Sequence, residues 1–336
     1  MLNVTLYSRK NSAPSDQVRA ELQKLQEKFP HRLIDVDVDS DPILLAKHGA
    51  GVPVVEAGPY VLKSPITPQS LQMTIGAAFD RRNQLEQVGD PKFQARVAKE
   101  GSIGTGDRVS FWISRNYLLL LNLFMLVYIG LPFLAPTLMK LGAEAPAQAI
   151  YRIYKPLCHQ FAFRSFFLFG EQPYYPLAEA GLGGVKTFEE VSGIPDLDDP
   201  YSMTRFQARQ YIGNEEVGYK MALCERDVAI YLAILLFGII YGLTGRRIKS
   251  LPFVWWILVG IAPIGLDGFS QLFSQFNWDF LSSIVPYRES TPFLRTLTGA
   301  LFGLGTAWFA YPNIEDSMNE TRQYYIKKFA LNQVSK

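Results

Sequence analysis

The 336-residue sequence contains only two cysteines, Cys158 and Cys224. So few cysteines exclude a scaffold held by several disulfides, although they leave room for one bond between them. Neither sign of charge is in clear excess, since 33 lysines and arginines face 31 aspartates and glutamates. This balance gives no indication of a nucleic-acid partner, and we expect none. Residues 1–30 lack the apolar segment of a secretory signal.

Long apolar runs are missing from the first 116 residues and concentrated after them. Residues 117–311 hold nearly all of these runs and four of the five tryptophans. This asymmetry predicts a soluble head followed by a multi-pass membrane domain, with the lipid bilayer as its partner. Because the first apolar segment follows residue 116, we expect the head to stay on the cytoplasmic side.

Residues 1–85 show the pattern of a small α/β layer fold. Val18, Leu22, Leu25 and Phe29 recur at the spacings of an amphipathic helix. Alternating apolar segments and turn residues predict the other elements. The expected strands are 3–7, 32–38 and 52–56, and the further expected helices are 41–48 and 67–79.

Three features of this head resemble glutaredoxins and other small thioredoxin-fold proteins: a Tyr7-Ser8-Arg9 segment, a helix opening at Asp16, and Gly51-Val52-Pro53-Val54. The resemblance implies a thioredoxin-like fold with Pro53 as its cis-proline, beside a peptide-binding edge. The redox Cys-x-x-Cys positions hold Ser12-Ala13-Pro14-Ser15. A serine hydroxyl cannot replace a thiolate in disulfide exchange, so we expect a degenerate, redox-inactive loop of Ser12, Ser15 and Pro53.

The expected fold class is thus an α/β thioredoxin-like head followed by an all-α transmembrane bundle of about four spans. The domain boundaries are a head at 1–85, a linker at 86–116, a membrane domain at 117–312 with an outer loop at 170–221, and a tail at 313–336. The expected spans are 117–139, 222–243, 251–273 and 292–311. Aromatic and basic residues alternate in 147–169, which predicts an interfacial helix rather than a fifth span.

Basic residues near the spans indicate the orientation. Arg108 and Arg115 precede the first span, and Arg246, Arg247 and Lys249 follow the second. The four-span arrangement places both groups on one side, which the positive-inside rule makes cytoplasmic together with both termini. Gly299 and Gly303, four residues apart in the last span, predict close helix packing.

With this orientation, a set of polar residues gathers at the outer face. Cys224, Asp227 and Tyr231 share one face of the second span, and Asp267 and Gln271 repeat the arrangement in the third. Ionisable groups at such depth usually pair with one another. The other members of the candidate site are Cys158, His159, Gln160, Arg164, Arg226 and Arg295.

The same motifs resemble an uncharacterised family of prokaryotic integral membrane proteins. They are Cys158-His159-Gln160 with Arg164-Ser165-Phe166, Cys224-x-Arg226-Asp227, Asp267-Gly268-x-x-Gln271, and Arg295-x-x-Thr298-Gly299. The resemblance covers about residues 115–312 and implies no established activity. Relative to compact members, residues 171–215 look like an insertion.

Three interpretations of the two thiols stay open. Cys158, His159, Cys224 and Asp267 could ligate zinc or copper. Cys158 and Cys224 could instead form a structural or redox disulfide, or be packed and inert. The sequence accordingly predicts a membrane protein of unknown activity that binds metal or carries out thiol redox chemistry. The alternative prediction is a non-catalytic accessory or scaffold subunit of a larger membrane complex.

Overall fold

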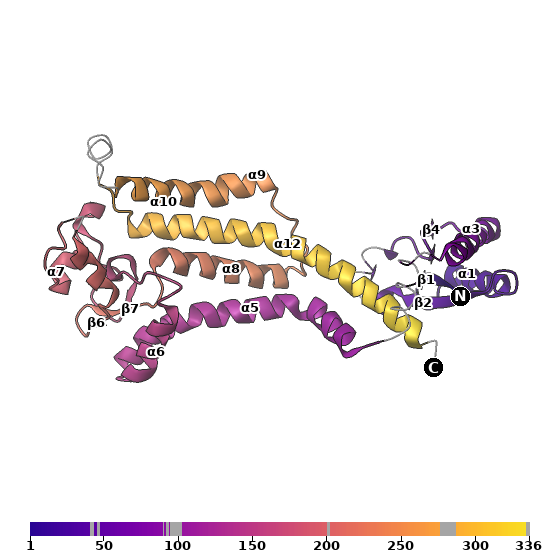
Figure 1. The fold of residues 1–336 in the computed structure, drawn as a ribbon, viewed down its shortest axis with the longest axis horizontal. Helices are drawn as coiled ribbons and strands as arrows, with labels where there is room; N and C mark the ends of the chain where they lie inside the picture. The colour runs from indigo at the N-terminus through magenta and orange to yellow at the C-terminus, as the bar shows by residue number, and fades with distance from the viewer. Residues whose placement is uncertain are drawn as a thin grey trace. The chain divides into compact units, whose positions relative to one another are not determined.

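The computed structural model describes residues 1–40, 44, 45, 48–89, 91, 94, 103–199, 202–275 and 287–333. The chain divides into two compact units, Met1–Asn116 with Asp316–Lys336 and Tyr117–Glu315. We call these the head unit and the membrane unit (Figure 1). Most of the expected linker between residues 89 and 103 lies outside the described residues.

The head unit is a mixed α/β structure, as predicted. Its four-stranded sheet has the order β2-β1-β3-β4, with β1 parallel to β2 and antiparallel to β3. Val4 and Leu6 of β1 pack with Leu22 and Ile75 of the helices in a fully buried core. The elements are β1 (Leu2–Ser8), α1 (Ala13–Leu25), β2 (His31–Asp37), β3 (Val54–Ala57), β4 (Tyr60–Lys63) and α3 (Pro68–Val88).

One element of the head differs from expectation, and another falls partly outside the described residues. β4 was not predicted, because only one of its four residues is partly buried and the alternation that marks a strand is lost. The expected helix over 41–48 lies partly outside the described residues.

The loop of Ser12, Ser15 and Pro53 has two defined features. The Val52–Pro53 peptide bond is cis, and Ser15 Oγ donates a hydrogen bond to Ser12 Oγ at 3.1 Å.

The end of helix α12 (Pro292–Gln333) belongs to the head unit. Ile326 and Ala330 pack against the apolar cluster that includes Tyr7 and Val54. Lys327 pairs with Glu56, and its ammonium lies 5.5 Å from the Tyr7 ring centroid. Residues 313–333 of the expected tail are therefore a continuation of α12.

The membrane unit consists mainly of long helices. Three of them are long and apolar enough to cross a membrane: α5 (Thr105–Lys140), α8 (Glu225–Leu243), and the helix from Phe253 to Ser274. The third comprises α9 (Phe253–Trp255), a π-helical segment (Trp256–Ile261) and α10 (Ala262–Ser274). α12 is not among the three, so a fourth span at 292–311 stays a prediction. Because α5 begins at Thr105, the expected linker ends before residue 116.

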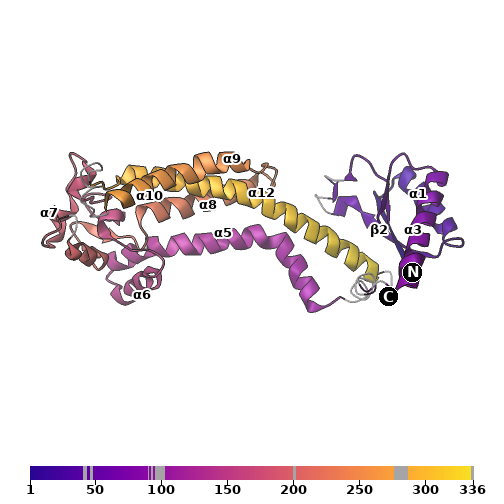
Figure 2. The ribbon, with the colours of Figure 1, turned by 45° about the horizontal axis from the view of Figure 1, so that its top comes forward.

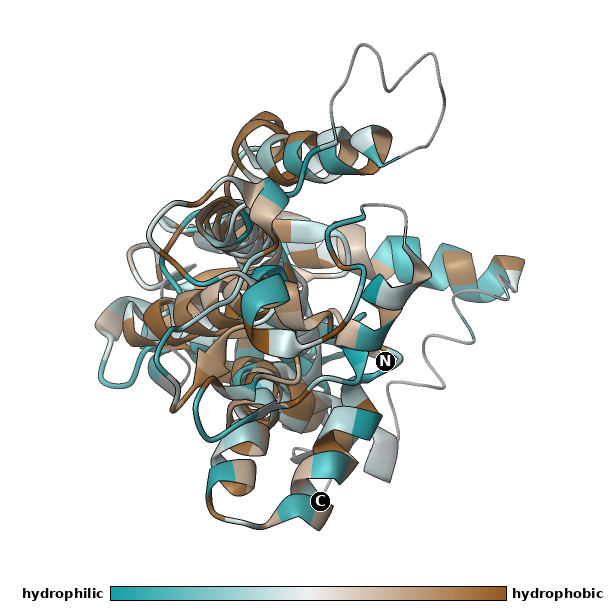
Figure 3. Cartoon of the chain, turned by 90° about the vertical axis from the view of Figure 1, so that its left-hand side faces the viewer, coloured by the Kyte–Doolittle hydropathy of each residue, from teal (hydrophilic) through white to brown (hydrophobic). Residues whose placement is uncertain are grey.

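These helices run side by side in two views (Figure 1, Figure 2). Seen end-on, they carry many apolar residues, coloured brown (Figure 3). The close packing predicted for the glycine pair is confirmed. A Cβ on Gly303 would lie 2.2 Å from the Ile230 carbonyl oxygen, and one on Gly299 would lie 2.6 Å from that of Arg226. Thr291 caps α12 by accepting a hydrogen bond from the Leu294 N–H at 3.2 Å.

Residues 155–223 form a small folded region, which we call the cap. Its strands β5 (Phe167–Leu168), β7 (Gly218–Lys220) and β6 (Gly213–Asn214) pair in that order, and α7 (Phe188–Ser192) lies between β5 and β6 in the chain. Its own core is buried and includes Phe163, Tyr175, Phe188 and Leu197.

The cap corrects two expectations. The membrane domain is mostly helical but not all-α, because the cap carries a sheet. Residues 147–169 are not one interfacial helix: α6 (Glu144–Tyr154) ends early. Gln160 (φ 55°) and Phe169 (φ 67°) then adopt the left-handed backbone conformation, which interrupts helical continuation. The aromatic residues counted as interfacial include Phe163 and Phe167, which are buried in the cap core.

Candidate functional site

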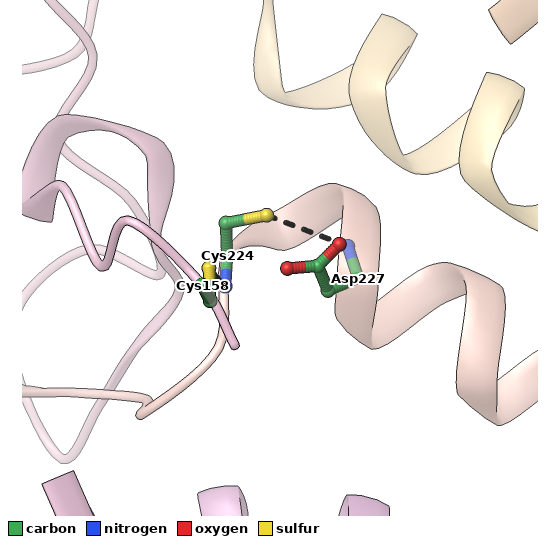
Figure 4. A group of neighbouring side chains, drawn as sticks. All are labelled: Cys158, Cys224 and Asp227. Carbon is green, nitrogen blue, oxygen red and sulfur yellow. Dashed lines mark hydrogen bonds between the residues drawn. The ribbon is translucent and has the colours of Figure 1, made fainter. Parts of the chain in front are cut away.

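The two cysteines meet where the cap joins α8. Cys224 is the N-cap residue of α8, and its Sγ accepts a hydrogen bond from the Asp227 N–H at 3.5 Å. The Cys224 N–H donates to Cys158 Sγ at 3.4 Å. One ligand atom from each of Cys158, Cys224 and Asp227 lies within 4.8 Å of the other two. We call this set the thiol–carboxylate group (Figure 4).

Gln160 holds the segment around Cys158 against the segment before α8. Its amide Nε2 donates to the Tyr151 carbonyl at 3.0 Å and to the Ala222 carbonyl at 2.9 Å. Gln160 is buried, so both bonds are shielded from water and contribute more than exposed ones would. This cross-link explains how thiols separated by 66 positions become neighbours.

The metal-ligand set that the sequence predicts differs from this group. His159 is exposed and stacks on Phe161, with ring centroids 5.9 Å apart, whereas its neighbours Cys158 and Gln160 are buried. His159 contributes no ligand atom to the three that lie within 4.8 Å of one another. Asp267 lies in a separate ion-pair network, and the carboxylate of the group comes from Asp227. Tyr231 packs edge-on against Tyr128 at 4.6 Å.

One centre of that network is Glu289, which precedes α12. Arg164 binds it through two guanidinium nitrogens, at 2.7 and 2.8 Å, and Arg295 pairs with the same carboxylate. Gln271 donates to it at 2.7 Å. Burial alone would raise the pKa of Glu289, but the two arginines outweigh burial and hold that pKa below its ordinary value.

The other centre of the network is Asp267 on α10. It pairs with Arg226 of α8 and with Arg288 at 2.9 Å. Ser290 Oγ lies 2.8 and 2.9 Å from the two carboxylate oxygens. Asp267 is buried, so these partners provide the compensation that a desolvated charge requires.

The sequence analysis missed four members of the network: Glu225, Arg288, Glu289 and Ser290. Glu225 is fully buried and accepts from Arg295 at 3.4 Å. Three of these residues could have been found from the sequence. Arg288-Glu289-Ser290 stands directly before the Thr291-Pro292 helix start, where charged residues border an apolar run. The arginines are thus placed chiefly as structural partners that hold the ends of α8, α10 and α12 together.

Comparisons with known proteins agree with a membrane assignment. Residues 216–309 match the model of a family described as predicted membrane protein (DUF2085). The chain is also similar to the uncharacterized protein MJ1492 of Methanocaldococcus jannaschii, with 24% identity over 206 residues. That match covers 60% of this chain and 93% of the relative. No solved structure gives a significant match. The matched family segment contains Cys224, Asp227, Asp267 and Arg295.

Proposed function

We propose that this protein is a multi-pass membrane protein that binds zinc or copper between Cys158, Cys224 and Asp227 at the extracytoplasmic face. The proposal depends on one observation: a ligand atom of each residue lies within 4.8 Å of the other two. Two thiolates and a carboxylate suit zinc, and the thiolate pair suits copper(I). Three protein ligands leave a tetrahedral zinc ion one position for water or a substrate.

Metal binding here would release the protons of the two thiols, because thiolates are the ligands. Each sulfur accepts a backbone N–H, from Cys224 in one case and from Asp227 in the other. Cys224 also caps α8, so its Sγ lies at the positive end of the helix dipole. Both residues are free cysteines.

Metal analysis of purified, detergent-solubilised protein tests the proposal. We expect about one zinc or copper ion per chain, and loss of the metal in Cys158→Ser and Cys224→Ser. His159→Ala is the matched control, because His159 is an exposed neighbour outside the group and its removal should leave the metal in place. A metal-free protein whose two cysteines form a disulfide on non-reducing mass analysis would overturn the proposal in favour of the disulfide interpretation.

The topology that we propose has four spans, with 292–311 as the fourth and both termini in the cytoplasm of the cell. At one end of the membrane unit Tyr117 donates to Glu315 at 2.5 Å, and Arg246 pairs with Glu315 at 3.2 Å. At the other end are the thiol–carboxylate group and the cap. Arg246 and its neighbours Arg247 and Lys249 lie at the first end, which supports its cytoplasmic assignment.

A second proposal concerns the head, as a glutaredoxin-like, redox-inactive domain of an accessory subunit. Its support is that serines occupy the redox positions and that the end of α12 packs against the cluster around Tyr7, next to Val52. Such a head would bind another subunit and would not exchange disulfides with it. Purification in mild detergent should recover other membrane-complex subunits at constant stoichiometry, and a partner-free chain in that preparation would remove this proposal.

A further inference from the structure

A small pocket opens between α6 and the cap, separate from the thiol–carboxylate group. Its volume is about 180 Å³. Arg152 and Lys155 line it from α6 and the turn that follows, and Arg209 and Lys220 line it from the cap. All of these residues belong to the membrane unit.

The pocket is strongly positive. Four of its nine lining residues are lysines or arginines, and none is an aspartate or glutamate. In the described part of the chain, the hydrogen bonds of these cations go to backbone carbonyls: Lys220 Nζ donates to Gln160 and Arg209 at 2.8 Å, and Arg209 Nε donates to His159 at 2.9 Å. Carbonyl oxygens orient the cations but do not neutralise them.

The base of the pocket is buried and already assembled. Lys220 is 1% exposed and Gln160 is 4% exposed. Tyr151 Oη donates to the Lys220 carbonyl at 2.5 Å, and the Gln160 amide bonds to the Tyr151 carbonyl at 3.0 Å. A site held in place before binding loses little conformational entropy when a ligand enters.

A buried cation without a carboxylate is costly unless an anion approaches it. Burial lowers the pKa of Lys220 to about 7; nearby Cys158 opposes this effect, and the charges of Arg209 and Lys155 add to it. An anion in the pocket would relieve the repulsion among all three cations and offset the desolvation of Lys220.

We propose that the pocket binds a phosphate group, either of inorganic phosphate or of a phospholipid headgroup. Two guanidinium groups and two ammonium groups around one small volume suit an anion with several acceptor oxygens. Arg152 and Lys155 lie in and just after α6, the helix that follows the first candidate span, so the headgroup of a lipid beside that end of the span would be near them. The inference does not depend on metal at the thiols.

The test uses the full chain in uncharged detergent at physiological ionic strength. One arm titrates inorganic phosphate by calorimetry, and the other measures retention of phosphatidylglycerol against phosphatidylcholine by native mass spectrometry. Saturable binding in the first arm indicates free phosphate, and selective retention of the anionic lipid indicates a headgroup; either supports the proposal.

Variants locate the binding. Lys155→Gln with Arg209→Gln should weaken binding about tenfold or more, since the phosphate group loses two charge-assisted contacts. The control, Lys140→Gln with Lys186→Gln, removes two cations that do not line the pocket and should leave affinity unchanged. No saturable binding in either arm, equal affinity for acetate, or full affinity in the folded pocket variant would each overturn the proposal.

Discussion

Arg164 and Glu289 form a two-pronged ion pair across 125 positions of sequence, with N–O distances of 2.7 and 2.8 Å. The pair connects the cap to the residues that start α12. Only 1% of the Glu289 side chain is exposed, so water screens the pair little. Because Arg295 and Gln271 bind the same carboxylate, Glu289 connects the cap, α10 and α12.

Neutralising that carboxylate should destabilise the membrane unit. In Glu289→Gln, Arg164 and Arg295 lose their shared counter-charge while staying desolvated, which should cost about 3–5 kcal/mol. Reversible unfolding in detergent measures the loss. The matched control is Glu171→Gln, whose 2.7 Å pair with Lys186 is half-exposed and should contribute nothing measurable. Equal stability of the two variants would contradict the structural role of the network.

Gly303 should not accept a side chain. The added Cβ of Gly303→Ala would lie 2.2 Å from the Ile230 carbonyl oxygen, so α8 and α12 would have to separate, at a cost of about 1–3 kcal/mol. Gly265→Ala on α10 meets nothing within 4 Å and serves as the control. Unfolding of both variants in the same detergent gives the comparison. A Gly303→Ala protein as stable as wild type would mean that the helices do not touch there.

Lys220 should make stability rise with pH. Its pKa is lowered to about 7 in the folded chain, while an unfolded lysine keeps a value near about 10.4. Between these values the unfolded state binds more protons, so the free energy of unfolding increases as pH rises through this window. Below it, the cost of the charged, buried lysine is fully present.

Thermal unfolding of wild type and Lys220→Met in phosphate-free buffer, from about pH 6 to about pH 9, measures this effect. The advantage of the methionine variant over wild type should shrink as pH rises. Lys140→Met, at an exposed position, changes the same charge and should run parallel to wild type. Parallel curves for Lys220→Met as well would show that this lysine titrates normally.

The proposed orientation predicts which positions are open to the outside. In a Cys158→Ser, Cys224→Ser background, a membrane-impermeant maleimide should label Glu215→Cys in intact cells. It should label Gln72→Cys in the head only after lysis. Both positions are exposed, so accessibility within the protein does not separate them. The opposite labelling pattern would invert the topology.

The candidate site shows how far residue patterns lead. The predicted topology grouped Cys158, His159, Cys224 and Asp267 at the outer face, with Asp227 among the other polar residues there. Residue patterns did not separate Asp227 from Asp267, because both are carboxylates near the outer ends of predicted spans. The choice depends on how α8 and α10 are rotated, which is a property of packing.

The sequence by itself determined the α/β character of the head and three long apolar helices, since these follow from local periodicity and from the length needed to cross a bilayer. Only the tertiary structure decided that the cap has its own core, that α12 continues into the head unit, and that Glu289 rather than Asp267 receives Arg164 and Arg295. Those outcomes depend on contacts between residues up to hundreds of positions apart, whose geometry no local pattern encodes.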